Sequence, residues 1–83
     1  SHYDIPSGLY ISDVTKGSDA EAKGIKVGDI LIECNGVEVK TTDDVAEIKS
    51  GLSVGDSIHF KIWRDGETYE VDVELMDTND IYN

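Results

Sequence analysis

The sequence predicts a small α+β domain, in which a partly open antiparallel β-barrel or sandwich carries two helices. Short apolar segments of strand length recur along the chain, separated by glycine-containing turns. The dipeptides Asn35-Gly36 and Asp65-Gly66 are typical of tight hairpin turns. Residues 18–24 and 41–52 each begin with a hydroxyl-bearing capping residue and continue with a helix-like composition. At 83 residues the chain is one domain or a fragment of a larger protein.

The apolar run Ile30–Cys34 is expected to be the central strand of the sheet. Its residues do not alternate between apolar and polar, because Leu31 lies between two isoleucines. Such a run is typical of a strand that is covered on both faces. Cys34 is the only cysteine, so neither an internal disulfide nor a cysteine metal cluster can form, and its place in the strand indicates a buried thiol.

Three further segments alternate apolar and polar residues as half-buried strands do. These are residues 8–14, residues 56–64 and the stretch that returns after the Asp65-Gly66 turn, while residues 37–39 form a strand stub. The residues expected to face the core are Leu9, Ile11, Ile58, Phe60, Ile62, Tyr69, Val71, Val73 and Leu75.

The first predicted helix covers residues 19–23, with Ser18 as its N-cap and Gly24 as its C-terminal stop. Alone it is too short to persist, so we expect packing through Ala22 and Ile25 to hold it in place.

The second predicted helix begins at Thr41 or Thr42 and carries aspartates in its first turn. Val45, Ile48 and Leu52 follow at spacings of three and four residues and form one apolar stripe. We expect the chain to divide into a lead-in (1–7), a folded domain (8–76) and a polar tail (77–83).

Composition excludes several classes of function. The formal net charge of −11 disfavours binding to nucleic acid and to anionic lipid. No apolar run approaches the length of a membrane span, and no signal peptide is present. His2 and His59 have no partner at a metal-ligand spacing, and no glycine-flanked serine nucleophile occurs. The sequence therefore predicts no catalytic residue, no metal site and no cofactor.

The order of motifs along the chain resembles a PDZ domain. The motifs are Gly8-Leu9-Tyr10-Ile11, Gly17-Ser18, Ala20 and Ala22, Gly24-Ile25, Gly28-Asp29-Ile30, Asn35-Gly36, Gly55-Asp56 and Arg64-Asp65-Gly66. Together with the lead-in Tyr3-Asp4-Ile5-Pro6-Ser7, they are similar to the bacterial form carried behind the trypsin-like protease domain of HtrA/Deg serine proteases. The resemblance covers residues 3–75.

The resemblance implies that a peptide C-terminus is captured by strand addition beside the second helix. The positions that match the family's groove are Thr41, Val45 and Ile48, with Val45 and Ile48 as an apolar floor. Many animal PDZ domains have a histidine where Thr41 stands, so their preference for a hydroxyl residue is not implied here. Asp44 should disfavour acidic side chains. The alternative that Val45 and Ile48 are simply core residues stays open.

In the HtrA-type arrangement, the carboxylate-binding loop and the peptide-pairing strand precede the lead-in. Residues 1–7 contain no such loop and strand, so we expect half of the groove to be missing and peptide affinity to fall about a thousandfold. We also expect the edge at residues 9–12 to pair with a neighbouring molecule.

The expected function is a peptide-recognising module that regulates an extracytoplasmic HtrA-like protease, periplasmic or at the cell surface, in protein quality control. Its partners would be apolar peptide or protein C-termini and the parent protease domain. Two alternatives stay open. One is a structural or oligomerisation module that uses an exposed sheet edge, and the other is the PDZ module of a tail-specific or intramembrane protease.

Overall fold

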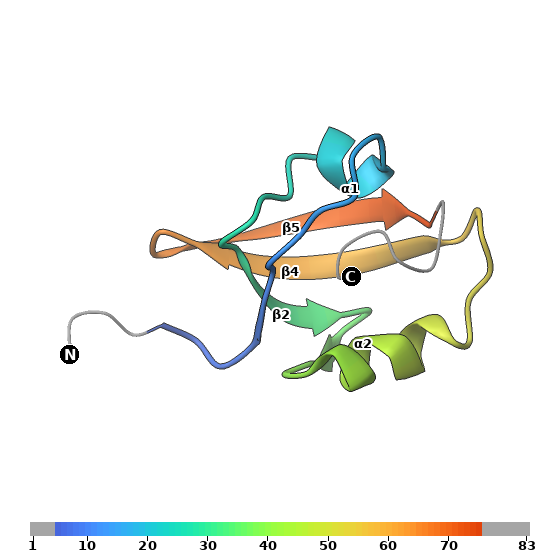
Figure 1. Ribbon diagram of the computed structural model, residues 1–83. Helices are drawn as coiled ribbons and strands as arrows, with labels where there is room; N and C mark the ends of the chain where they lie inside the picture. Colours follow the sequence, from blue (N-terminus) through green and yellow to red (C-terminus); the bar gives the residue numbers. More distant parts are fainter. Residues whose placement is uncertain (1–4, 76–83) are drawn as a thin grey trace.

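The computed structural model describes residues 5–75, which form an open antiparallel sheet and two helices (Figure 1). The expectations for residues 1–4 and 76–83 lie outside this range. In chain order the elements are β1 (Leu9–Tyr10), α1 (Asp19–Ala22), β2 (Ile30–Cys34), β3 (Val37–Glu38), α2 (Thr42–Lys49), β4 (Ser57–Arg64) and β5 (Glu67–Glu74). The predicted α+β class with an antiparallel sheet is confirmed.

β2 is the central strand, as its apolar sequence predicts. The strand order is β1-β2-β4-β5, and β3 also pairs with β2. β1 pairs with the start of β2 through Leu31, whereas β3 pairs with its end through Cys34. β4 pairs with both stretches of β2. β1 and β3 therefore share one edge of β2, and β4 occupies the other.

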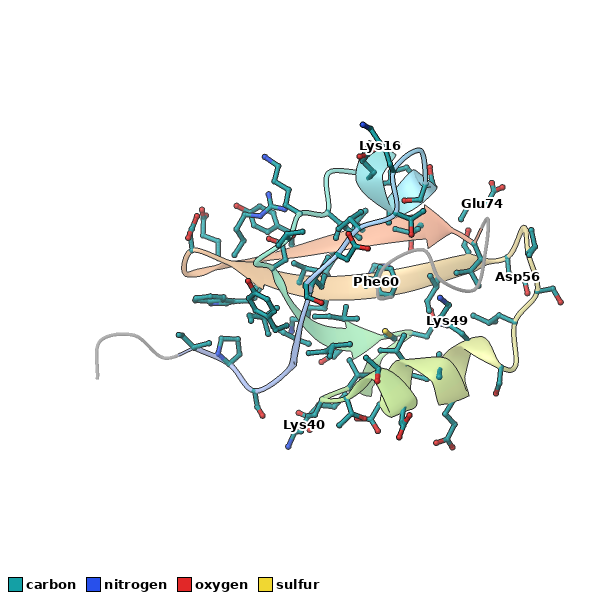
Figure 2. The ribbon with its side chains drawn as sticks, in the orientation of Figure 1. Lys16, Lys40, Lys49, Asp56, Phe60 and Glu74 are labelled. Atoms are coloured by element: carbon teal, nitrogen blue, oxygen red, sulfur yellow. The ribbon has the colours of Figure 1, made fainter. Side chains whose placement is uncertain are left out.

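The core lies between the sheet and the two helices, with Phe60 near its centre (Figure 2). The buried apolar side chains are Ile11, Ala20, Ile25, Leu31, Cys34, Val39, Val45, Ile58, Phe60, Ile62, Val73 and Leu75. Leu9 and Val71 pack against this core and are partly buried, as their strand positions predict.

The prediction that Tyr69 faces the core is wrong, because 44% of this residue is exposed. Tyr69 has the inward phase of β5, but it lies near the β4–β5 turn, beyond the part of the strand that α1 covers. Its ring lies under the guanidinium of Arg64 instead, 5.4 Å from ring centroid to Cζ.

The first strand is shorter than predicted, since only Leu9–Tyr10 of the expected residues 8–14 is a strand. The N–H of Ile11 donates to the Asp29 carbonyl at 2.9 Å, and the chain then leaves the sheet for the loop before α1. Gly8 lies so close to β2 that a Cβ atom there would be 2.6 Å from the Leu31 carbonyl oxygen. A side chain at this position would push β1 away from the sheet.

α1 is capped as its sequence predicts but is packed differently. The Ser18 Oγ accepts a hydrogen bond from the Glu21 N–H at 3.2 Å. Ala20, not Ala22, is the residue of α1 that is buried. Ala22 lies on the solvent side of this single turn, whereas Ile25 enters the core as expected.

α2 begins after a capping box. The Thr41 hydroxyl accepts from the Asp44 N–H at 3.1 Å, and the Asp44 carboxylate accepts from the N–H of Thr41 at 3.1 Å. Val45 is fully buried, while Ile48 and Leu52 pack against the core and keep part of their surface exposed. The predicted apolar stripe is therefore present, with a gradient of burial along it.

Both predicted hairpin turns have the expected backbone. Asn35 and Asp65 have φ values of 51° and 50°, and a glycine with positive φ follows each. Asparagine and aspartate tolerate this left-handed region better than most residues. Within residues 5–75, neither helix has the length and apolar composition of a membrane span.

Candidate functional site

A hollow of about 360 Å³ lies between β3 and α2. Its wall on the helix side includes Ile48, which is half-buried, and its wall on the sheet side includes Val37, which is 54% exposed. The residues that line it are Val37, Glu38, Asp44, Glu47 and Ile48. An apolar side chain entering this hollow could contact both Val37 and Ile48.

The structure distributes the three predicted site residues over three environments. Ile48 lines the hollow, and Thr41 is exposed at the N-terminus of α2, where its hydroxyl already caps the helix. Val45 has 0% exposure and lies inside the core. The burial of Val45 fits the core alternative, and the peptide-binding role of all three residues stays a prediction.

Three residues of the hollow were not predicted from the sequence. Val37 and Glu38 belong to the short strand β3, and Glu47 lies on the exposed side of α2. No sequence pattern singles out these residues, and the one local cue is the apolar Val37 directly after the Asn35-Gly36 turn.

The hollow is negatively charged. Glu38, Asp44 and Glu47 contribute three carboxylates to it. The backbone N–H groups of Lys40 and Thr41 donate to the Asp44 carboxylate and lower its pKa, so Asp44 is ionised at neutral pH. Such a surface favours a neutral or cationic guest over an acidic one.

α2 also carries a buried cation, Lys49. Lys49 is only 6% exposed and projects from the helix toward the sheet (Figure 2). Its charge acts on Cys34, where burial raises the thiol pKa to about 12 and Lys49 opposes part of this shift. Cys34 is therefore protonated at neutral pH and is a buried apolar residue, as its place in β2 predicts.

At the end of β4, next to the β4–β5 turn, Arg64 forms a two-point ion pair with Asp29. The Nε and Nη2 atoms of Arg64 donate to the two carboxylate oxygens of Asp29, each at 2.7 Å, and Nη2 also donates to the Gly24 carbonyl. Burial raises the pKa of Asp29, but the bonds from Arg64 and from the Lys26 N–H outweigh it, so the pKa is lowered. The pair ties the loop before β2 to the end of β4.

His59 lies on the exposed face of the β4–β5 hairpin between two carboxylates. Its Nε2 and Nδ1 atoms are 2.8 Å from Glu70 and 2.7 Å from Asp72. The bond to Glu70 and then that to Asp72 raise the pKa of His59. Each ring nitrogen has a different carboxylate partner, and no group of three or more side chains in residues 5–75 has the arrangement of a metal site.

Comparison with known proteins identifies the domain family. The family model described as "PDZ domain" matches residues 1–75. A probable periplasmic serine endoprotease DegP-like of Bartonella henselae is 34% identical over 82% of this chain, and a serine protease Do-like HtrB of Bacillus subtilis is 33% identical over 82%. The chain spans only 13% and 15% of these two relatives.

Solved structures show the same fold. The PDZ domain of an SdrC-like protein of Listeria monocytogenes has a TM-score of 0.74 and 19% identity, with 87% of this chain and 75% of that chain covered. A solution structure from Geobacillus thermodenitrificans also has a TM-score of 0.74, with 20% identity, and the match covers 95% of this chain and 94% of that one.

These matches confirm the resemblance inferred from the order of motifs, and they confirm that the chain is not a catalytic domain. The chain belongs to the PDZ domain family, and its curated relatives include HtrA- and DegP-like serine proteases.

Proposed function

We propose that this PDZ domain is the peptide-recognition module of a serine protease. It binds apolar C-termini or extended segments of substrates by strand addition beside α2, and it thereby regulates the protease domain. The observation that carries the proposal is the hollow between β3 and α2, where the exposed Val37 faces the half-buried Ile48. Family membership and the names of the relatives support the same reading.

The hollow has the two features that strand addition requires. β3 pairs with β2 along one edge, and its second edge has no strand partner within residues 5–75. A guest strand gains affinity from main-chain hydrogen bonds and selectivity from pockets for its alternate side chains. Val37 and Ile48 supply the apolar contact, while Glu38 and Glu47 select against acidic neighbours.

The proposal also includes the cellular location of the parent protein and the boundaries of the folded domain. The printed names of several relatives describe periplasmic endoproteases, which supports an extracytoplasmic parent. Regular structure extends from Leu9 to Glu74, which supports a folded domain at residues 8–76 with residues 1–7 and 77–83 flanking it.

Titration with a fluorescent peptide that ends in apolar residues tests the proposal. Val37→Lys should weaken binding by about tenfold or more, because it removes apolar contact from the hollow. The matched control is Val54→Lys, since Val54 is a 70% exposed valine in the loop before β4 and does not line the hollow. Equal affinity of both variants, or a larger loss in Val54→Lys than in Val37→Lys, would count against the proposal.

An oligomerisation module is the second candidate. Tyr10 is 57% exposed on the edge strand β1, which pairs only with β2 among the described residues. Edge strands of this kind recruit strands from other chains. Sedimentation velocity distinguishes the two functions: growth in size with concentration and no response to peptide would favour this candidate.

A further inference from the structure

β5 forms the second outer edge of the sheet, opposite β1. Its residues pair with β4 in an antiparallel ladder from Glu67 to Glu74, so every second residue directs its backbone N–H and C=O away from β4. Leu75 exchanges hydrogen bonds with the residues just before β4. The outward-directed residues are therefore Thr68, Glu70, Asp72 and Glu74.

α1 occupies half of this edge. The Glu74 N–H donates to the Asp19 carboxylate at 2.8 Å, and the Lys23 ammonium donates to the Asp72 carbonyl at 2.9 Å. The bond from Glu74 is the largest cause of the lowered pKa of Asp19, so this carboxylate is ionised as it accepts. Two side chains of the short helix thus replace a strand partner at the C-terminal half of β5, and Figure 1 shows α1 beside this end.

The half of β5 nearer the hairpin turn is not covered in this way. Thr68 and Glu70 are exposed, and within residues 5–75 no hydrogen bond reaches their outward backbone groups. Next to them lies a hollow of about 290 Å³. Its lining includes the apolar side chains of Ile25, Ile62, Tyr69 and Val71 and the cations Lys23 and Arg64.

The hollow has an apolar floor, and the positive charges at its rim are paired with carboxylates. Ile25 and Ile62 are buried beneath it, while Tyr69 is 44% exposed. The two cations of the rim already have partners, since Lys23 pairs with Asp19 and Arg64 pairs with Asp29. A volume of this size is at the lower limit of ligand pockets, so it fits a side chain better than a cofactor.

The negative charge of β5 determines what kind of peptide segment can pair with its free edge. β5 carries four carboxylates, those of Glu67, Glu70, Asp72 and Glu74, and the single His59 ring contacts two of them, Glu70 and Asp72, so acidic groups remain in excess at this edge. A second copy of β5 in antiparallel pairing would bring these carboxylates against one another, and like charges on adjacent strands destabilise pairing. A guest with basic residues removes this repulsion, and its other residues can enter the apolar hollow because side chains alternate along a strand.

We propose that the free edge of β5 at Thr68–Glu70 and the hollow between α1 and β5 form a second strand-addition site, separate from the hollow at α2. The occupant is an extended segment of another protein in which apolar and basic residues alternate. The apolar residues contact Tyr69 and Val71, and the basic residues lie beside Glu70 and Asp72. The site needs no terminal carboxylate, because only main-chain edges and side chains contribute to it.

The probe is an acetylated and amidated heptapeptide of alternating lysine and valine, which offers no free carboxylate. In amide hydrogen exchange by NMR, its addition to the full chain should slow exchange at Thr68 and Glu70 and leave Val37 and Glu38 unchanged. Slowed exchange at Val37 and Glu38 instead, or no change at Thr68 and Glu70, would overturn the proposal. An increase in the size of the free chain that itself protects Thr68 and Glu70 would also overturn it, since the occupant would then be a second copy.

Two N-methylated forms of the probe supply a matched control. One form is methylated on the backbone nitrogens of its lysines and the other on the backbone nitrogens of its valines. Each form therefore lacks the backbone N–H donors along one edge of the peptide. Strand addition uses one edge, so one form should lose affinity about tenfold or more and the other should bind nearly as the parent does. Equal loss or equal retention in the two forms would exclude strand addition.

Charge and apolar contact are tested by variants that leave the ladder with β4 intact. Glu70→Gln should weaken binding of the lysine–valine peptide, whereas Glu47→Gln, which alters the hollow at α2, should not. A peptide with glutamate in place of lysine should bind at least about tenfold more weakly. If Glu47→Gln has the larger effect, or if the glutamate peptide binds as well, the proposal fails.

Discussion

Both helices of this domain bury apolar residues in the core, but they differ in the polar bonds that tie them to the sheet. α1 has one turn, and its region is tied by directional polar bonds, from Asp19 and Lys23 to β5 and from Arg64 to the Gly24 carbonyl and Asp29. α2 has eight residues and packs against the core through Val45 and Ile48, with the buried Lys49 on the same helix.

The capping bonds of α2 show the contrast. The hydrogen bonds of Thr41, Asp44 and Ser50 all remain within the helix and the residues beside it. Polar bonds hold one geometry, whereas apolar contact tolerates small shifts of one surface over another. The side chains of α1 thus hold part of the edge of β5 in one geometry, whereas the capping bonds of α2 provide no such tie to the neighbouring strand β3.

The largest expected effect on stability comes from breaking the ion pair between Arg64 and Asp29. Arg64→Met leaves the Asp29 carboxylate, which is 2% exposed, buried without its partner, and should lower the free energy of unfolding by about 3 kcal/mol. Lys61→Met on the same strand is the control, with an expected loss below about 1 kcal/mol. Urea unfolding at neutral pH measures both, and equal losses would refute the assigned role of the pair.

The same variant has a defined pH dependence. Because the pKa of Asp29 is lowered in the folded state, its contribution is present above the unfolded pKa of about 3.9 and is lost as pH falls through the folded value. The stability difference between Arg64→Met and the unmodified chain should therefore shrink as the pH drops below about 4. A difference that grows in acid would contradict the ion-pair explanation.

A smaller effect is expected on the apolar side. Val45→Ala removes two buried methyl groups and should cost about 2 kcal/mol of stability, whereas Ile48→Ala, at a half-buried position, should cost about 1 kcal/mol. Peptide affinity should respond in the opposite order, because Ile48 lines the hollow and Val45 does not. Thermal unfolding and peptide titration of both variants measure this. A larger loss of affinity in Val45→Ala would reverse the assignment.

The smallest effect should come from the exposed polar cluster around His59. Its pKa is raised by Glu70 and Asp72, so its contribution is present below the unfolded pKa of about 6.5 and is lost as pH rises through the folded value. The difference in unfolding midpoint between the unmodified chain and His59→Gln should therefore shrink from pH 6 to pH 8. A constant difference would show that His59 acts through packing alone.

Most of the fold could be predicted from helix caps, turn dipeptides and alternation of apolar residues, because each of these signals depends on only a few neighbouring residues. The helix caps at Ser18 and Thr41 and the turns at Asn35 and Asp65 are present as expected. Alternation placed Ile58 and Val73 correctly, but it failed for Tyr69, because periodicity gives the phase of a strand and not how far the core extends along it.

The candidate sites were harder to predict because they depend on distant parts of the chain. Arg64 and Asp29 are separated by 35 positions, and no local pattern pairs them. Val37 and Ile48 meet only when α2 folds back beside β3. Ile48 was predicted through resemblance to a family, and its role in peptide binding stays a prediction, whereas the free half of β5 follows only from where α1 ends.

Cys34 has a practical consequence for measuring these forces. With 0% exposure and a thiol pKa of about 12, it meets neither condition for reaction with an alkylating reagent while β2 stays in place. The rate at which Cys34 is alkylated in the absence of denaturant therefore reports how often the centre of the sheet opens. Because Cys34 is the only thiol of the chain, its labelling rate reports the loosening of either helix without an attached dye.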